Sequence, residues 1–164
     1  MSHTKHQSMS HPMSRARKLA RGVAAVELGI TMVPLLVLTF GVTEYGRAIY
    51  TYNALDKATR DAARHLTSVV STNPDPKGEA RNLAVYGNIT GTGTPLAPGL
   101  TTAMVNICDA TDCPGTHAGV ATGTGVVNLV TVNITGYVYN SIVTYVAPAT
   151  LNFNDISTTM RSHL

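Results

Sequence analysis

Cysteine is scarce in this sequence, and little else in it can build a metal site or a catalytic set. The only two cysteines are Cys108 and Cys113. A structural zinc site needs four ligands, and His117, the nearest histidine, adds only a third. The sequence also has no glycine-rich phosphate loop, and its histidines have no convincing Ser, Cys or Asp partner. We therefore predict no metal, no cofactor and no enzymatic activity.

The spacing of the two cysteines leaves two interpretations open. A local disulfide between Cys108 and Cys113 is favoured if this part of the chain faces an oxidising compartment. Two free thiols remain if it does not. The predicted disulfide therefore depends on export of this region.

Acidic residues are absent from the first 22 positions, which hold five of the twelve basic residues. The rest of the chain has seven basic and nine acidic residues, a formal charge of −2. The high isoelectric point therefore belongs to a leader and not to a folded binding face, so we predict no nucleic-acid binding. Residues 1–22 are polar and cannot bury a core, so we expect a disordered, basic cytoplasmic leader.

Charge is nearly absent again from Val23 to Val42, where Glu27 is the only charged residue. Twenty helical residues span roughly the ~30 Å hydrocarbon core of a bilayer. This predicts a transmembrane helix over residues 23–43, with its N-terminus in the cytoplasm because the positive residues precede it. A cleaved secretory signal is an alternative, but no Ala-x-Ala site follows the apolar stretch.

An amphipathic continuation of this helix is predicted over residues 44–72. The apolar residues recur every three or four positions, which places them on one helix face. Asn73-Pro-Asp-Pro76 should end the helix, because proline lacks the donor and its ring clashes with the preceding turn. The members of the predicted face are Tyr45, Ile49, Tyr52, Leu55, Ala58, Ala62, Leu66 and Val69.

Residues 73–164 are predicted to form a small extracytoplasmic, β-rich head. One or two helical turns are expected over residues 78–87, and a Gly/Pro/Thr-rich loop over residues 87–101. Strands are expected at residues 102–108, 126–139 and 151–160, with the β-branched middle segment as the main strand. The predicted fold class is α+β, a long N-terminal helix followed by a small antiparallel β-rich head.

The junction around Gly22 resembles the processing site of type IV pilin precursors. A positive cluster precedes Gly22, the apolar helix starts at Val23, and Glu27 lies five residues after the glycine. The resemblance implies cleavage between Gly22 and Val23 by a prepilin peptidase. A carboxylate in an apolar helix persists mainly where it is paired, and the new N-terminus of a neighbouring subunit could pair with Glu27. In the alternative, Glu27 lies at the membrane interface of an uncleaved anchor.

The stretch from Arg21 to Arg64 resembles the TadE-like family, pilin-like proteins of the tight-adherence (Tad, or Flp) pilus system. Leu28 departs from the pattern, because the family usually has an aromatic residue there. The matching residues are Gly22, Ala25, Val26, Glu27, Pro34, Leu35, Leu36, Phe40, Gly41, Glu44, Gly46, Arg47, Tyr50, Ala54, Leu55, Arg60, Ala62, Ala63 and Arg64.

The resemblance implies a minor pilin or pseudopilin that acts in pilus assembly, initiation or adhesion. Its partners would be the prepilin peptidase, other pilins or pseudopilins, the Tad inner-membrane assembly platform and the lipid bilayer. The chain would cross the bacterial inner membrane once, with a periplasmic head, and could enter a cell-surface pilus. The alternative function is an uncleaved single-pass protein whose head binds a component of the secretion machinery.

Three further residues are candidates for contacts between subunits: Pro34, Glu44 and Arg47. Pro34 could kink the helix or allow it to melt locally on assembly, although membrane helices tolerate proline. Glu44 and Arg47 could contact another subunit, or they could form an i,i+3 pair on the surface of their own helix.

Overall fold

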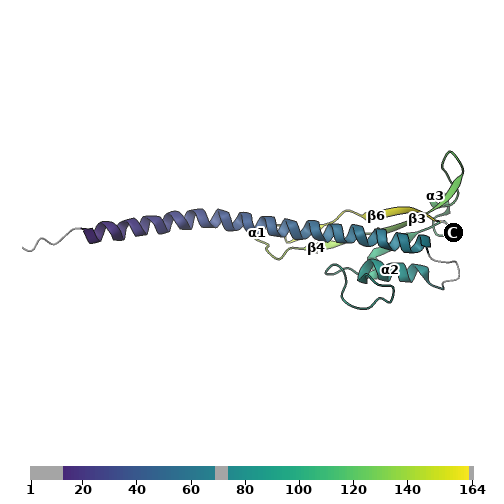
Figure 1. Ribbon diagram of the computed structural model, residues 1–164, viewed down its shortest axis with the longest axis horizontal. Helices are drawn as coiled ribbons and strands as arrows, with labels where there is room; N and C mark the ends of the chain where they lie inside the picture. Colours follow the sequence, from purple (N-terminus) through teal and green to yellow (C-terminus); the bar gives the residue numbers. More distant parts are fainter. Residues whose placement is uncertain (1–12, 69–73, 163–164) are drawn as a thin grey trace, which may run out of the picture. The chain divides into compact units, whose positions relative to one another are not determined.

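The computed structural model describes residues 13–68 and 74–162. The chain divides into two compact units, residues 1–42 and residues 43–164. One long helix, α1 (Met13–Ser68), begins in the first unit and ends in the second, which holds every other element (Figure 1). The fold class is α+β, with the long N-terminal helix followed by small antiparallel sheets, as predicted.

The helix α1 begins earlier than the sequence analysis predicted. Residues 13–22 are helical, so the expected lack of structure is wrong for them, and residues 1–12 lie outside the described residues. Arg, Lys, Leu and Ala dominate this stretch and are strong helix formers, and extending an existing helix costs less than starting a new one. At its other end α1 is described to Ser68, and the rest of the predicted continuation, residues 69–72, lies outside the described residues.

The second helix, α2 (Pro76–Tyr86), has a capping residue at each end. The Asp75 carboxylate accepts a hydrogen bond from the backbone N–H of Gly78 at 2.8 Å, and Pro76 follows at the first turn, where a missing N–H costs nothing. Gly87 ends the helix in the left-handed region, with φ of 71°. The helical turns predicted over residues 78–87 are confirmed.

A four-stranded antiparallel sheet is built around the predicted main strand. Its members are β1 (Val105–Cys108), β2 (Val120–Ala121), β3 (Val126–Ile134) and β6 (Ile156–Ser162). Each of the other three pairs with β3, and β6 pairs along seven positions from Asn128 to Ile134. Two short helices occur in this region: η1 (Thr102–Met104) precedes β1, and α3 (Pro114–His117) lies between β1 and β2 in sequence. The helix η1 replaces the start of the strand predicted at residues 102–108.

A second, two-stranded sheet consists of β4 (Val138–Asn140) and β5 (Thr150–Asn152). The predicted strand over residues 126–139 is therefore interrupted. Gly136 has a φ of 69°, a left-handed conformation that breaks the extended chain. The strand predicted at residues 151–160 is likewise divided between β5 and β6.

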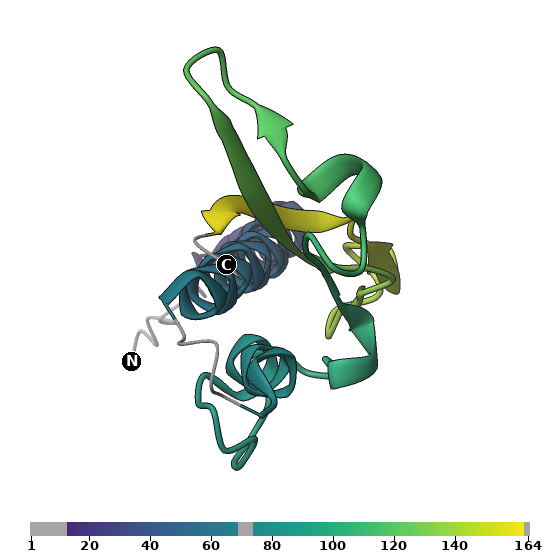
Figure 2. The same cartoon turned by 90° about the vertical axis from the view of Figure 1, so that its right-hand side faces the viewer.

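The core of the second unit lies between α1, the large sheet and α2. Figure 2 shows the C-terminal part of α1 with β3 and β6 on one side and α2 on the other. Leu55 and three alanines of α1 are almost completely buried, and small side chains allow backbones to approach closely. The largest contributions from the other elements are Val85, Leu100, Val132 and Ile134.

The buried face of α1 differs from the predicted one near its start in this unit. Leu55, Ala58, Ala62 and Leu66 are buried as predicted, but Tyr45, Ile49 and Tyr52 are exposed, and Val69 is not described. Glu44 and Ala48 occupy the buried face instead. A charged residue therefore stands where the periodicity predicted an apolar one.

Candidate functional site

The residues predicted for processing and assembly lie on an apolar, fully accessible part of α1. Gly22, Val23, Glu27 and Pro34 belong to the first unit, where every residue from Gly22 to Phe40 is exposed. Among the described residues, one stretch of helix, Gly22–Ser68 of α1, is long and apolar enough to cross a membrane. Glu27 makes no hydrogen bond or ion pair with the described side chains. Any partner of its carboxylate therefore lies outside the described side chains.

Pro34 lies inside α1 without ending it. Its ring removes the N–H that would bond to the carbonyl oxygen of Ile30. Nearby, the Thr31 hydroxyl donates to the backbone oxygens of Glu27 and Leu28, at 3.0 and 3.1 Å. This part of the helix therefore has one backbone hydrogen bond fewer than an uninterrupted helix. Contacts of Pro34 with another subunit stay a prediction.

Glu44 is the most heavily bonded charged side chain near the start of the second unit. Its side chain is only 3% exposed. One carboxylate oxygen, Oε1, accepts from the Tyr139 hydroxyl at 2.9 Å and from the backbone N–H of Ile142 at 3.0 Å. Arg47, one turn further along α1, donates to the same oxygen at 3.1 Å. We call these four residues the Glu44 clasp, because they join α1 to β4 and to the loop that follows it.

The clasp keeps Glu44 ionised. Burial alone would raise the pKa of this carboxyl group. The hydrogen bonds from Ile142 and Tyr139, together with the positive charge of Arg47, outweigh burial, so the pKa of Glu44 is lowered from its ordinary value. For Tyr139, burial and the bond to Glu44 raise the pKa, so its hydroxyl remains a donor at neutral pH.

Aromatic rings pack against the clasp. The ring of Tyr139 stacks on Phe153 with a centroid distance of 6.0 Å, and the Arg47 guanidinium lies 5.7 Å from the Tyr139 centroid. Phe153 also contacts Tyr52 of α1 edge-on, at 5.6 Å. A hydrogen bond shielded from water in this way is electrostatically stronger than an exposed one.

The interpretation of Glu44 and Arg47 as a surface pair is therefore wrong in one respect. The i,i+3 pair does form, but only Arg47 is accessible, and Glu44 is committed to its own head. Contacts of these two residues with another subunit stay predictions. Sequence reasoning missed Tyr139 and Ile142, which lie 95 and 98 positions away from Glu44. No local pattern marks such distant partners.

The two cysteines are joined in the structure by a disulfide between Cys108 and Cys113. His117 lies next to them, and its two ring nitrogens contact the hydroxyls of Thr116 and Thr131 at 2.7 and 2.8 Å. These three residues could bring together at most three metal ligands. Bonded to each other, however, the sulfurs are not thiolates, the form in which cysteine binds metals.

The loop that this disulfide closes is tied to α2 by charge. Lys77 bridges Asp109 and Asp112, each at 2.7 Å. Burial alone would raise the pKa of Asp109, but the bond from Lys77 and two backbone N–H groups lower it. These contacts hold the loop in place. The ammonium group of Lys77 is already paired with both aspartates, so it is not free to bind an anionic ligand.

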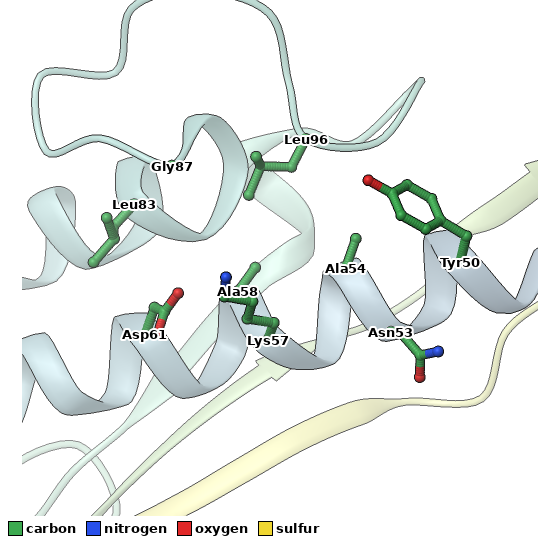
Figure 3. Close-up of a pocket in the computed structure, with 9 residues that line it drawn as sticks. All are labelled: Tyr50, Asn53, Ala54, Lys57, Ala58, Asp61, Leu83, Gly87 and Leu96. Atoms are coloured by element: carbon green, nitrogen blue, oxygen red, sulfur yellow. The ribbon is translucent and has the colours of Figure 1, made fainter.

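A groove of about 550 Å³ lies between α1 and α2 (Figure 3). Ala54 and Ala58 of α1 form part of its wall, and Leu83 and Leu96 face them from α2 and the following loop. Tyr50 lies at one end of the groove, while Lys57 and Asp61 add charge along α1. The groove is mainly apolar and holds no arrangement of catalytic side chains.

Comparison with protein-family models adds the decisive observation for the N-terminal part. Residues 22–64 match the model described as TadE-like protein. This segment is TadE-like. The TadE-like segment contains Gly22, Glu27, Pro34 and both helix residues of the clasp, and it ends before α2 and the sheets. Searches of curated proteins and of solved structures found no match.

The TadE-like family indicates a pilin-like protein associated with a Tad pilus, and the family is structural rather than enzymatic. The TadE-like segment covers α1 from Gly22 to Arg64, so it includes all but the last four residues of the membrane-span candidate, Gly22–Ser68. The sheets that supply Tyr139 and Ile142 lie outside the matched residues.

Removal of the Tyr139 hydroxyl tests the clasp. Tyr139→Phe takes away one donor to a charged acceptor, so the free energy of unfolding should fall by about 1–2 kcal/mol. Denaturant titration of the full chain in detergent would measure it. Tyr145→Phe is the matched control, because that side chain is 99% exposed and its change should leave stability unaltered. Equal stability of the two variants would show that the hydrogen bond from Tyr139 to Glu44 contributes nothing to stability.

Proposed function

We propose that this chain is a minor pilin or pseudopilin of a Tad-type pilus, cleaved by prepilin peptidase between Gly22 and Val23. The observation that carries the proposal is the match to the TadE-like model, which begins at Gly22 itself. The basic leader would remain in the cytoplasm. Residues 23–43 would cross the inner membrane, residues 44–72 would continue the helix, and residues 73–164 would form a periplasmic head.

The exposed apolar surface of α1 supports an assembly role. A soluble protein buries such a helix, whereas here every residue from Gly22 to Phe40 is exposed in the part of the chain that the structure describes. Lipid tails can cover this surface before assembly, and the apolar helices of other pilins can cover it afterwards. The same segment thus serves as an anchor and as the contact between subunits.

Glu27 gives this contact a specific partner. A carboxylate surrounded by hydrocarbon costs several kcal/mol unless it is paired. Cleavage before Val23 would create an α-ammonium group, and in a filament the ammonium of one subunit can lie against Glu27 of its neighbour. Pairing would remove the cost of both charges and would fix the stagger between subunits.

The size of the head favours a minor over a major subunit. Cleavage after Gly22 would leave 142 residues, and most of them belong to the second unit. That unit has its own hydrophobic core, sheets and disulfide. A head of this size suits a subunit present in few copies, which starts a pilus, ends it or binds a surface. Its partners would include the inner-membrane assembly platform of the Tad system.

The mature N-terminus tests processing directly. Intact-mass measurement of the membrane-purified protein from cells that contain the peptidase should give a chain that starts at Val23. In cells without the peptidase the mass should correspond to the complete leader. An intact leader in both strains would instead support an uncleaved single-pass protein whose head binds the secretion machinery. A start beyond residue 40 would indicate an exported protein without the anchor.

Substitution of Glu27 tests the assembly role. Glu27→Ala should still insert into the membrane, because it makes the span more apolar, but it should reduce pilus formation. Membrane fractionation and counts of surface pili would separate the two effects. Glu79→Ala, which changes a carboxylate of α2 in the head, is the control for charge loss. Normal piliation in Glu27→Ala would remove this residue from the mechanism.

A further inference from the structure

The loop between β4 and β5, residues 141–149, presents apolar side chains without any charge nearby in sequence. Ile142 is 72% exposed and Tyr145 is 99% exposed. No Lys, Arg, Asp or Glu occurs between Asp112 and Asp155. The loop therefore has no such charged side chain that would favour its exposure to water. Exposed apolar residues grouped in this way usually mark a surface that another molecule or a membrane covers.

The Glu44 clasp determines where this loop lies along α1. The backbone N–H of Ile142 is held 3.0 Å from the Glu44 carboxylate. Glu44 comes two residues after Val42, the last residue of the apolar run, which is about 3 Å along a helix. In Figure 1 β4 lies at the opposite end of the head from α3. Within the second unit, the exposed loop therefore starts beside Glu44, close to the unit's first residue.

Close to Glu44, α1 also exposes residues of the kinds found at membrane–water interfaces. Tyr45, Ile49 and Tyr52 lie within eight residues of Glu44 and are exposed. Tyrosine is enriched at membrane–water interfaces, because its ring is apolar and its hydroxyl is polar. The accessible guanidinium of Arg47 suits contact with lipid phosphates. Further along α1 the exposed residues become charged, starting with Lys57, Arg60 and Asp61.

We propose that residues 141–149 enter the interface of the bilayer as a second membrane contact, with Ile142 and Tyr145 inserted among the lipids. This inference rests on the proposed function, because it requires residues 23–43 to span the membrane. The loop would hold the head against the bilayer surface before the subunit leaves the membrane. A second copy of the chain is a weaker candidate for this surface, since the clasp holds Ile142 at Glu44, only two residues after the apolar run ends.

Single-tryptophan variants of the full chain test the proposal, because the sequence contains no tryptophan. Tyr145→Trp reports on the loop in phosphatidylcholine vesicles, with or without bromine on the acyl chains near the headgroup. We expect blue-shifted emission and a clear loss of intensity with the brominated lipid. Val126→Trp is the matched control: the residue is 70% exposed, begins β3 and should show neither effect.

Leu36→Trp separates failure of this inference from failure of the proposed function. Leu36 lies within the apolar run and should be quenched strongly by bromine deep in the acyl chains. If Leu36→Trp is quenched while Tyr145→Trp behaves like Val126→Trp, the loop proposal is overturned and the span remains. If Leu36→Trp is not quenched, the loop proposal and the proposed membrane span both fail. Blue-shifted emission from Tyr145→Trp that depends on protein concentration and not on brominated lipid would assign the loop to a second copy, and would also overturn the proposal.

Discussion

The head depends on one buried carboxylate. Glu44 stands on the core-facing side of α1, where an unpaired charge would be strongly unfavourable. It is tolerated because a tyrosine hydroxyl, a backbone N–H and a guanidinium all bond to it. Those donors come from segments almost a hundred residues apart, so the carboxylate fixes β4 and its following loop at one level of the helix.

A second polar contact fixes the large sheet along the same helix. Thr59 of α1 is completely buried, and its hydroxyl lies 2.9 Å from that of Thr158 in β6. Apolar packing between the two polar positions is nondirectional and would allow the sheet to shift along the helix. Glu44 and Thr59 together exclude such shifts. A fixed head position matters for a pilin-like chain. If the head cannot shift along its helix, the packing of the helices in a filament also determines where the heads lie.

The sequence was most informative where structure follows from local chemistry. The apolar run, the stop at Pro74 and Pro76 and the β-branched stretch of β3 predicted the long helix and the main strand. The failures share one cause. Tyr45 and Tyr52 were assigned to the buried face because they are large and correctly spaced. Glu44 lies on that face instead, because Tyr139 and Ile142 donate hydrogen bonds to its carboxylate. Gly136 similarly divides a uniform β pattern, and only the pairing of β4 with β5 shows why.

Amide hydrogen exchange at Ile142 tests the central claim most directly. NMR on the detergent-solubilised full chain would compare it with Ser141, whose N–H bonds to the backbone oxygen of Ala149 instead of to Glu44. The account predicts slow exchange at both amides, and a marked acceleration at Ile142 when Glu44 is changed to Ala. Exchange of Ile142 at the rate of an unstructured chain in the unmodified protein would show that the carboxylate does not hold this loop.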